Sequence, residues 1–243
     1  MTEYIQTAIK NGIGFLTLDR PKALNSLSLD MVRAITQALM RWSNDADVQA
    51  VVIKSSSERA FCAGGDIRFF YDMGHATPTG GSALIEDFFT EEYALNYLAH
   101  FYPKPYIALM DGIVMGGGMG IAQSGPSCQV RIVTERTKMA MPEVNIGLFP
   151  DVGGSYFLSR APGRLGVFLG VTGEVIGAAD ALYAGLADVF VPSVQLPALA
   201  ALLETTKTDH REAVRRFAAQ FQDQVDLAGS TLATEHGRID RHF

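Results

Sequence analysis

The stretch KPYIALMDGIVMGGGMGI, residues 104–121, carries the strongest indication of the fold. Its first half, residues 104–112, is a short apolar run of the kind typical of a buried strand. The glycine-rich residues that follow, 114–125, are expected to form a turn that opens a helix. A strand that passes through glycines into a helix is typical of α/β proteins, and it places backbone N–H groups without side-chain cover at the end of the strand.

A second glycine-rich turn, FCAGGDI at residues 61–67, follows another predicted strand at residues 48–56. Ligands of open α/β sheets bind at the carboxyl ends of the strands, so the two turns are candidates for one site. Two N–H groups directed at one point form an oxyanion hole, which stabilises an enolate or a tetrahedral intermediate. Glycines that only close tight turns are the alternative, and the residues alone leave both interpretations open.

The rest of the chain alternates between strand and helix patterns. Asn11-Gly12 predicts a hairpin within residues 4–21, and Ser28 is the expected N-cap of the next helix. The resulting strand-strand-helix rhythm predicts an α/β architecture with parallel strands. Further strands are expected at residues 128–135 and 138–143, helices at 28–45, 83–101, 151–160, 165–169 and 196–221, a helix, turn and strand within 176–192, a mobile loop at 74–82, and no defined structure at 230–243.

The composition excludes several classes of protein. The 243 residues are 48% hydrophobic and 19% charged, as in globular proteins, and the net charge of −6 does not favour nucleic-acid binding. No apolar run approaches the ~20 residues of a membrane span. The N-terminus lacks the basic region of a secretory signal. The two cysteines, Cys62 and Cys128, fit a reducing compartment. We therefore expect a soluble intracellular protein.

Two acids stand in the mostly apolar stretch AMPEVNIGLFPDVGGSYFL, residues 140–158. Asp151 could cap a helix that begins at Val152, and Glu143 could be a first-turn acid. Catalysis is the other explanation for two carboxylates in a segment that should be buried. The five histidines include no HExxH pattern or closely spaced pair, so we expect no metal site. Cys62 could be a nucleophile, but no histidine lies near it in sequence, which favours a small buried residue.

Taken together, these motifs resemble the crotonase (enoyl-CoA hydratase/isomerase) superfamily. The resemblance implies an α/β, ClpP/crotonase-like fold of repeated strand-strand-helix units with a helical C-terminal region. It implies a core at residues 1–193 and a helical region at 194–243, which we expect to be incomplete because the relevant hydrolases continue further. The motifs occur in family order over most of residues 3–203: RPKALNSL (20–27), RAFCAGGDIR (59–68), residues 104–121, MPEVNIGLFPDVGGSYFL (141–158) and residues 170–192.

Two features of the sequence favour one branch of this family. A hydratase of the family carries two catalytic glutamates; one position is Glu143 here, but the other is Gly120. FFTEEYALN (88–96) and GLFPDVGGSYFL (147–158) instead resemble the 3-hydroxyisobutyryl-CoA hydrolase branch. The resemblance implies hydrolysis of a short 3-hydroxyacyl-CoA in valine catabolism. The alternatives are an enoyl-CoA hydratase/isomerase of fatty-acid oxidation and a non-catalytic remnant.

The resemblance also implies roles for individual residues. Gly65 and Gly117 would donate N–H groups to the thioester carbonyl oxygen. Glu143 would activate water or attack the thioester, and a raised pKa is expected for an acid in this apolar segment. Asp151 would orient the substrate or protonate the leaving thiolate. Glu92 would bind the substrate hydroxyl, although a solvated acid on a helix face explains it as well.

The binding of coenzyme A is likewise implied by the family pattern. Lys22, Ala23 and Leu24 would lie along the pantetheine and the nucleotide. Lys22 or Arg68 would pair with phosphates, although exposed basic residues are commonly just solvated. We expect no cofactor besides the CoA of the substrate, no nucleic-acid or membrane partner, and a homo-oligomer. The compartment would be the cytoplasm of a bacterium or the mitochondrial matrix of a eukaryote. The backbone groups expected to hold the adenine belong to Ala63, Asp66 and Ile67.

Overall fold

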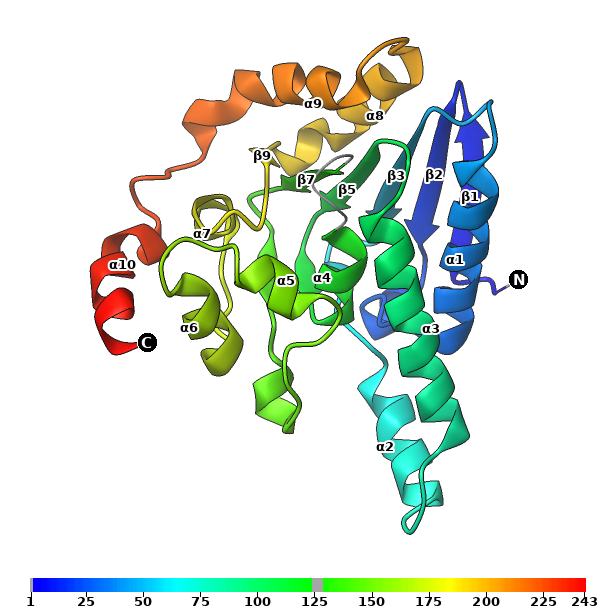
Figure 1. Ribbon diagram of the computed structural model, residues 1–243. Coiled ribbons are helices and arrows are strands. Elements are labelled where there is room, and N and C mark those ends of the chain that lie inside the picture. Colours follow the sequence, from blue (N-terminus) through cyan, green and yellow to red (C-terminus); the bar gives the residue numbers. More distant parts are fainter. Residues whose placement is uncertain (1, 124–128) are drawn as a thin grey trace.

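The computed structural model describes residues 2–123 and 129–243. Two sheets form its centre (Figure 1), a six-stranded sheet of order β1-β2-β3-β5-β7-β9 and a three-stranded sheet of order β4-β6-β8. β1 is antiparallel to β2, and the other strand pairs are parallel. The strands are β1 (Ile5–Lys10), β2 (Ile13–Leu18), β3 (Ala50–Ser55), β4 (Ala60–Cys62), β5 (Tyr106–Met110), β6 (Ile113–Met115), β7 (Gln129–Val133), β8 (Lys138–Ala140) and β9 (Val189–Phe190).

The predicted strand-strand-helix rhythm is confirmed. β3, β5 and β7 of the large sheet each lead into a short strand of the small sheet, β4, β6 and β8, before the next helical segment. The sequence patterns did not reveal β4 and β6 as strands, because three residues bounded by turns are too few to show a period of two. Cys128, the first residue of one predicted strand, lies outside the described residues, and β7 begins at Gln129.

The expected helices are present, but several boundaries differ. The helical stretch expected at 196–221 is divided into two α-helices, Leu196–Thr205 and His210–Ala218, and the helix expected at 165–169 continues to Thr172. Ser28 caps α1 as expected, because its side chain accepts a hydrogen bond from the Met31 N–H. The expected loop at 74–82 starts later, because α2 continues to Ala76. The helix expected from Asp151 starts at Gly154, and the C-terminal stretch forms α10 with Ser230 as its N-cap. The α-helices are α1 (Leu29–Ser43), α2 (Ile67–Ala76), α3 (Ala83–His100), α4 (Gly117–Ala122), α5 (Gly154–Leu158), α6 (Leu165–Thr172), α7 (Ala178–Tyr183), α8 (Leu196–Thr205), α9 (His210–Ala218) and α10 (Thr231–His242).

The hairpin between β1 and β2 forms where Asn11-Gly12 predicts it. Both residues have positive φ, 50° for Asn11 and 88° for Gly12. Two-residue turns of this kind match the right-handed twist of the flanking strands, and they require residues that tolerate φ > 0. The turn pairs Lys10 with Ile13 and thereby sets the register of the edge strand.

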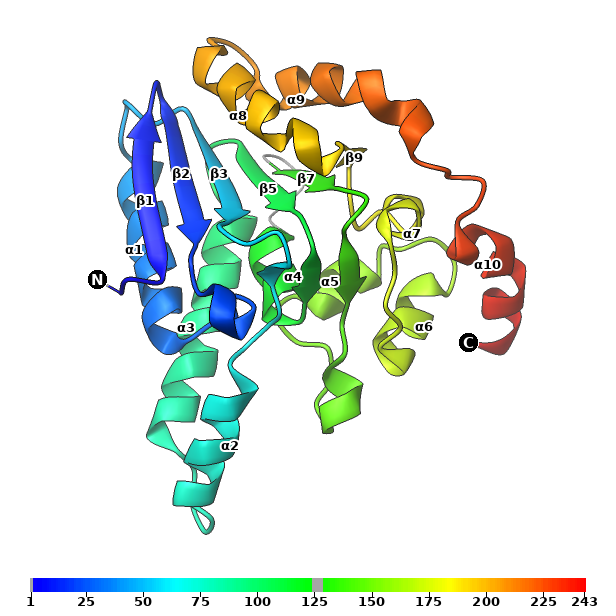
Figure 2. The ribbon, with the colours of Figure 1, turned by 180° about the vertical axis from the view of Figure 1, so that it is seen from behind.

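Alternate residues of the large sheet enter two separate cores. In β2, Leu16 and Leu18 face the core that includes the apolar side of α1, whereas Ile13 and Phe15 face the core shared with α8 and α9. This is the period of two expected of a strand buried on both faces. Figure 2 shows α8 and α9 on the side of the sheet away from α1 and α3. Helices therefore cover both faces of the large sheet.

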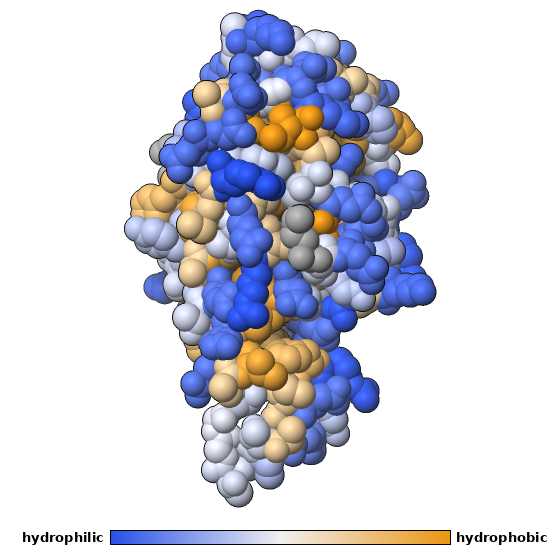
Figure 3. Space-filling model, turned by 90° about the vertical axis from the view of Figure 1, so that its right-hand side faces the viewer, coloured by the Kyte–Doolittle hydropathy of each residue, from blue (hydrophilic) through white to orange (hydrophobic). Residues whose placement is uncertain are grey.

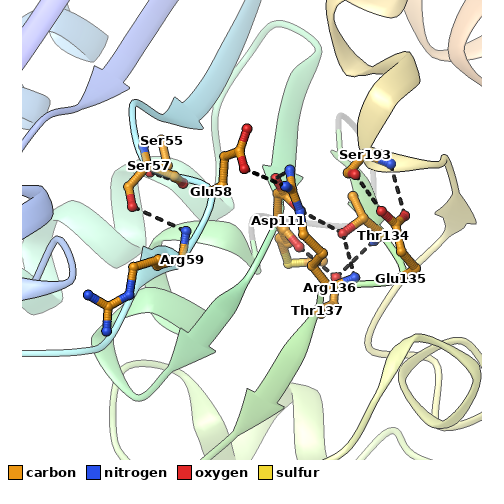
Figure 4. Close-up of polar contacts among 11 residues, drawn as sticks. Ser55, Ser57, Glu58, Arg59, Asp111, Thr134, Glu135, Arg136, Thr137 and Ser193 are labelled. Atoms are coloured by element: carbon orange, nitrogen blue, oxygen red, sulfur yellow. Dashed lines mark hydrogen bonds and ion pairs between the residues drawn. The ribbon is translucent and has the colours of Figure 1, made fainter.

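A polar network holds the turns that connect the long strands to the short ones (Figure 4). The Arg136 guanidinium, after β7, donates to Asp111 after β5 at 2.9 Å and to Glu58 after β3 at 2.9 Å. Thr134 Oγ1 also donates to Asp111 Oδ1, at 2.7 Å. Three turns that are far apart in sequence are thus fixed relative to one another, and with them the start of β4, β6 and β8.

The outer surface is largely polar, with local apolar areas. Figure 3 shows the side that carries α1 and α3, with separate hydrophobic areas, one of which lies toward the end formed by α2 and the start of α3. Ile67 and Leu84 are exposed on these two helices. Among the helices that the structure describes, none combines the length and the apolar character needed to cross a membrane.

Candidate active site

A cavity of about 230 Å³ brings the two glycine-rich turns and three acids together. The first turn follows β4, and the second opens α4. Glu92 comes from α3, whereas Glu143 and Asp151 come from the segment between β8 and α5. Seven of the residues expected from the sequence line this cavity: Ala63, Gly65, Ile67, Glu92, Gly117, Glu143 and Asp151.

The glycines of the second turn allow the acids to approach the backbone. A Cβ atom on Gly116, whose φ is +48°, would lie 2.6 Å from Glu143 Oε1. A Cβ atom on Gly117 would lie 2.5 Å from Glu92 Oε1. Real Cβ contacts are never this short, so a side chain at either position would displace a carboxylate. Glycine at these two positions therefore lets both acids occupy their present places in the site.

The backbone amides of the two turns lie near each other. A Cβ atom on Gly117 would be 3.4 Å from the Gly65 nitrogen, and one on Gly64 would be 3.6 Å from the Gly117 nitrogen. Gly117 is the first residue of α4, so its N–H has no partner within the helix. Within residues 2–123 and 129–243, neither the Gly65 nor the Gly117 N–H donates a hydrogen bond. Both amides can therefore donate to a ligand.

Glu92 is buried at the bottom of the site. It is 2% exposed, and its Oε1 has no hydrogen-bond partner among the described residues. Burial, followed by the charges of Asp151 and Glu143, raises the pKa of Glu92 to about 8. The side chain is therefore neutral at pH 7 and can donate a hydrogen bond. The alternative of a solvated acid on a helix face is wrong for this residue.

Glu143 is also buried, with 6% of its surface exposed. It is the first residue of a short 3-10 helix, Glu143–Ile146, and its Oε2 is without a partner in the described structure. Burial is the main cause that raises its pKa to about 7, and the charge of Asp151 adds to it. The raised pKa expected from the apolar segment is confirmed. An acid that titrates near neutrality suits general-base catalysis.

Asp151 is held by a residue that the sequence did not single out. Tyr93 Oη donates a 2.7 Å hydrogen bond to Asp151 Oδ2. Burial raises the pKa of Asp151, while the bond from Tyr93 opposes this shift. The capping role considered for Asp151 is not what the structure shows, because α5 begins at Gly154 with Gly153 at the N-cap. Its carboxylate instead faces α3.

The position of the second hydratase glutamate, Gly120, is closed by its neighbours. A Cβ atom there would lie 2.6 Å from Val152 Cβ and 2.8 Å from Asn96 Nδ2. Val152 has a φ of +43°, an unfavourable conformation for a β-branched residue. Such strain is often found beside functional groups, and here it lies next to Asp151. No side chain fits at Gly120 unless Val152 or Asn96 moves.

The segments expected to bind CoA lie side by side at the edge of the site. The Ala63 N–H donates to the Leu24 carbonyl at 3.0 Å, and the Asp66 N–H donates to Leu27 at 3.0 Å. Asp66 also caps α2 and pairs with Arg20 at 2.7 Å. The amides of Ala63 and Asp66 are thus engaged within the protein, and the Asp66 carbonyl oxygen also accepts a hydrogen bond from the Phe70 N–H at 3.2 Å.

The basic side chains considered for the phosphates lie outside the cavity. Lys22, in the 3-10 helix Pro21–Ala23, is exposed. Arg68 is exposed as well and pairs with Asp72 at 3.3 Å, in the next turn of α2. Of the residues carried over for CoA, Lys22, Ala23, Leu24, Asp66 and Arg68 do not line the cavity, whereas Ala63 and Ile67 do.

Cys62 is a structural residue. Its side chain is fully buried, and burial raises the pKa of the thiol to about 12, so the nucleophilic thiolate is absent near neutral pH. Its carbonyl oxygen lies against Gly118. Cys128 lies outside the described residues. In the part of the chain that is described, no group of three or more His, Cys, Asp or Glu side chains is placed to hold a metal ion.

A second, larger cavity of about 620 Å³ adjoins the first. Asp151 and Val152 line both, so Asp151 stands at their junction. Sequence analysis missed two polar residues of α3 at this place, Tyr93 and Asn96. Asn96 follows Glu92 by four residues, so helical spacing alone would have put it on the same face. Tyr93 gives no such signal, because its partner is 58 residues away.

Comparisons with known proteins agree with this architecture. The family model described as enoyl-CoA hydratase/isomerase matches residues 13–243. A mitochondrial 3-hydroxyisobutyryl-CoA hydrolase from Danio rerio is 44% identical over 233 residues, which are 95% of this chain and 59% of the relative. The hydrolase of the same name from Homo sapiens is 41% identical over 93% of this chain and 58% of its own. The chain thus spans less than two thirds of the length of these curated relatives.

Solved structures show the same fold. A carnitinyl-CoA dehydratase from Mycobacterium thermoresistibile has a TM-score of 0.88 and 41% identity, covering 100% of this chain and 67% of the other. An enoyl-CoA hydratase from Rhodobacter sphaeroides 2.4.1 has a TM-score of 0.84 and 40% identity, and the match covers 99% of this chain and 66% of the other. The predicted crotonase fold is confirmed, and the chain belongs to the enoyl-CoA hydratase/isomerase family.

Proposed function

We propose that this protein hydrolyses the thioester of a short 3-hydroxyacyl-CoA, with 3-hydroxyisobutyryl-CoA as the substrate and valine catabolism as its context. The observation that carries the proposal is the closed space at Gly120, where a Cβ atom would meet Val152 and Asn96. A hydratase of this family needs a second glutamate there. The curated relatives that match 93–95% of this chain carry the name of the hydrolase, which supports the same choice.

The first step is attack of water on the thioester carbonyl. The carbonyl oxygen accepts the N–H groups of Gly65 and Gly117, which stabilise the negative charge that develops on it. Removal of one such donor typically costs about 3 kcal/mol of transition-state stabilisation. Glu143 takes the proton from water, because its pKa of about 7 leaves a large fraction of the carboxylate available near neutral pH. A carbon–oxygen bond forms in this step.

The second step is collapse of the tetrahedral intermediate. The carbon–sulfur bond breaks, and the leaving thiolate of CoA receives a proton from Asp151. Burial raises the pKa of Asp151, which makes it a better proton donor than an exposed aspartate. Before the next turnover, Glu143 passes its proton to Asp151 or to solvent. The net reaction converts the thioester and water into the carboxylic acid and the thiol of CoA.

Two further groups of residues bind the substrate in this proposal. Glu92, neutral at pH 7, contacts the acyl group beside Gly117. CoA is held at the open side of the cavity by two segments, one with Lys22, Ala23 and Leu24 and the other with Ala63, Asp66 and Ile67. Lys22 and Arg68 are exposed, and they pair with the phosphates, Arg68 in exchange for its surface pair with Asp72. The CoA moiety belongs to the substrate, and no separate cofactor takes part.

Enoyl-CoA hydration is the second candidate, because the two solved structures with 40–41% identity are described as a dehydratase and a hydratase. One experiment separates the two reactions. The protein is incubated with 3-hydroxyisobutyryl-CoA and with crotonyl-CoA, and thiol release and the loss of enoyl absorbance are followed. We expect thiol release from the first substrate and no measurable hydration of the second. Efficient hydration without thiol release would reject the proposal in favour of a hydratase.

A chain inactive on both substrates would indicate the non-catalytic alternative. Because the chain spans about three fifths of the length of the curated relatives, the same assay should also be run on a protein of their full length. A homo-oligomer and a compartment, the bacterial cytoplasm or the mitochondrial matrix, remain part of the proposal. Size-exclusion chromatography with light scattering tests the first, and imaging of a tagged chain in its source organism tests the second.

A further inference from the structure

α3 and α4 are in close contact at two places, one helical turn apart, and at each a polar residue of α3 packs against a glycine of α4. Glu92 Oε1 would lie 2.5 Å from a Cβ atom on Gly117, and Asn96 Nδ2 would lie 2.8 Å from a Cβ atom on Gly120. Residues three or four apart on a helix are neighbours, with roughly 5–6 Å between their Cβ atoms. Asn96 therefore follows Glu92 on the face of α3 that packs against α4, and it lines the larger cavity.

The amide of Asn96 lacks partners. Within the described part of the chain, six buried side-chain nitrogen or oxygen atoms have no hydrogen-bond partner, and four of them belong to Glu92, Asn96 and Glu143. Both Nδ2 and Oδ1 of Asn96 are among the four. Buried polar groups are normally paired, because an unmet hydrogen bond costs stability. Asn96 thus shares its unpaired state with two acids of the active site.

The position of Asn96 fits a particular part of the substrate. If the carbonyl oxygen is bound at Gly65 and Gly117, an acyl chain that extends past Asp151 would reach the junction of the two cavities. Asp151 and Val152 line both cavities there, and Asn96 lines the larger one. The hydroxyl oxygen of a 3-hydroxyacyl group lies three bonds from the carbonyl carbon, so it reaches beyond the groups that would bind the carbonyl oxygen.

We propose that Asn96 is a specificity-determining residue whose Nδ2–H donates to the hydroxyl oxygen at carbon 3 of the acyl group, while Glu92 faces the same hydroxyl from the preceding turn. This inference rests on the proposed function, because it takes a 3-hydroxyacyl-CoA as the ligand. It adds a residue that selects the hydroxylated acyl group against its unhydroxylated analogue. A site built to bind a hydroxyl rejects the analogue that lacks it, because its buried polar groups would stay unpaired.

The test compares two substrates that differ in the hydroxyl alone, 3-hydroxyisobutyryl-CoA and isobutyryl-CoA. We expect the wild type to prefer the first in kcat/KM by at least about 100-fold. Asn96→Leu, which keeps the branching and the number of heavy atoms and removes both polar atoms, should lower this preference at least tenfold, mainly through the hydroxylated substrate. A role in folding alone would lower both rates equally and leave their ratio unchanged. Asn96→Ala serves as a second variant in case leucine does not fit against Gly120.

A binding measurement separates this inference from the proposed function. Calorimetry with two thioethers that cannot be hydrolysed, S-(3-hydroxy-2-methylpropyl)-CoA and S-isobutyl-CoA, measures selection for the hydroxyl without turnover. Absence of thiol release by the wild type would reject the proposed function. The inference about Asn96 would still stand if the wild type bound the hydroxylated thioether at least tenfold more tightly than the other and Asn96→Leu or Asn96→Ala lost that preference. Equal binding of both thioethers by the wild type overturns the inference, as does an unchanged substrate ratio in a folded Asn96 variant.

Discussion

Tyr93 on α3 donates a 2.7 Å hydrogen bond to Asp151, the acid at the junction of the two cavities. The bond orients one carboxylate oxygen and opposes the rise in the pKa of Asp151 that burial causes. Tyr93→Phe should therefore raise that pKa further. Because the Asp151 carboxyl also loses the bond that orients it, kcat should fall about tenfold, the value of one hydrogen bond to a charged group. Steady-state kinetics of thiol release measures the loss. Tyr71→Phe on exposed α2 is the control, and an equal loss in both variants would remove the special role of Tyr93.

Glu143→Gln should reduce thiol release by at least about 100-fold, because the amide cannot accept the proton of water. In the wild type, the rate should fall as the pH drops through about 7, where burial places the pKa of Glu143. Glutamine has the same shape, so folding and CoA affinity should stay near wild type. A pH–rate profile and a thermal melt check both points, with exposed Glu174→Gln as the control. A rate within twofold of wild type would show that Glu143 is not the base.

Asp151→Asn should lower the rate about 100-fold as well, because asparagine cannot protonate a thiolate. Its Oδ1 can still accept from Tyr93 Oη, so the stability should change little. Asparagine caps helices about as well as aspartate, but Gly153 occupies the N-cap of α5, so capping cannot explain a loss. Single-turnover thiol release measures the chemical step. A nearly silent variant would leave proton delivery to another group.

Gly120→Ala should lower the free energy of unfolding by about 2 kcal/mol, because the new methyl group would overlap Val152 Cβ and Asn96 Nδ2. Gly74→Ala is the matched control in α2. A Cβ atom there meets nothing within 4 Å, so alanine should stabilise the helix by about 0.5–1 kcal/mol. Urea denaturation gives both values. Equal stability of the two variants would contradict the packing described around Gly120.

Glu92→Gln should make the stability of the protein less dependent on pH. Burial raises the pKa of Glu92 from 4.5 to about 8, so the native state binds a proton more tightly than the unfolded chain. The stabilisation from this proton is fully present below pH 4.5 and is lost as the pH rises through 8. The variant should thus be more stable than wild type at pH 9, by roughly 2–4 kcal/mol.

The neighbouring acid is the control for this measurement. Glu91 is partly exposed and pairs with Arg33 at 2.6 Å, and that hydrogen bond lowers its pKa. Glu91→Gln should therefore change the stability by about 1 kcal/mol or less, and it should not gain stability at pH 9. Urea unfolding at pH 5, 7 and 9 compares the three proteins. Parallel pH curves for wild type and Glu92→Gln would mean that Glu92 is charged at neutral pH.

Much of this site was predictable because its signals are local in sequence. Glu143 and Asp151 stand out as acids in an apolar segment, and the glycine-rich turns mark the ends of strands. The family motifs then indicated the crotonase fold and the hydrolase branch of the family. Tyr93 and Asn96 were missed, since their significance depends on the packing of α3 against α4 and the segment before α5. The three-residue strands β4 and β6 were missed because they form only through pairing with distant strands.

Gly116 and the glycines of α4 also restrict which substitutions this protein can accept. Gly116 is confined by Glu143, Gly117 by Glu92, Gly118 by the carbonyl of Cys62, and Gly120 by Val152 and Asn96. Each constraint comes from a different part of the chain, so no single substitution relaxes more than one of them. A carboxylate at position 120 would require Val152 and Asn96 to move or to be replaced. Because these three residues are in contact, we expect the effects of substitutions at positions 96, 120 and 152 to be non-additive.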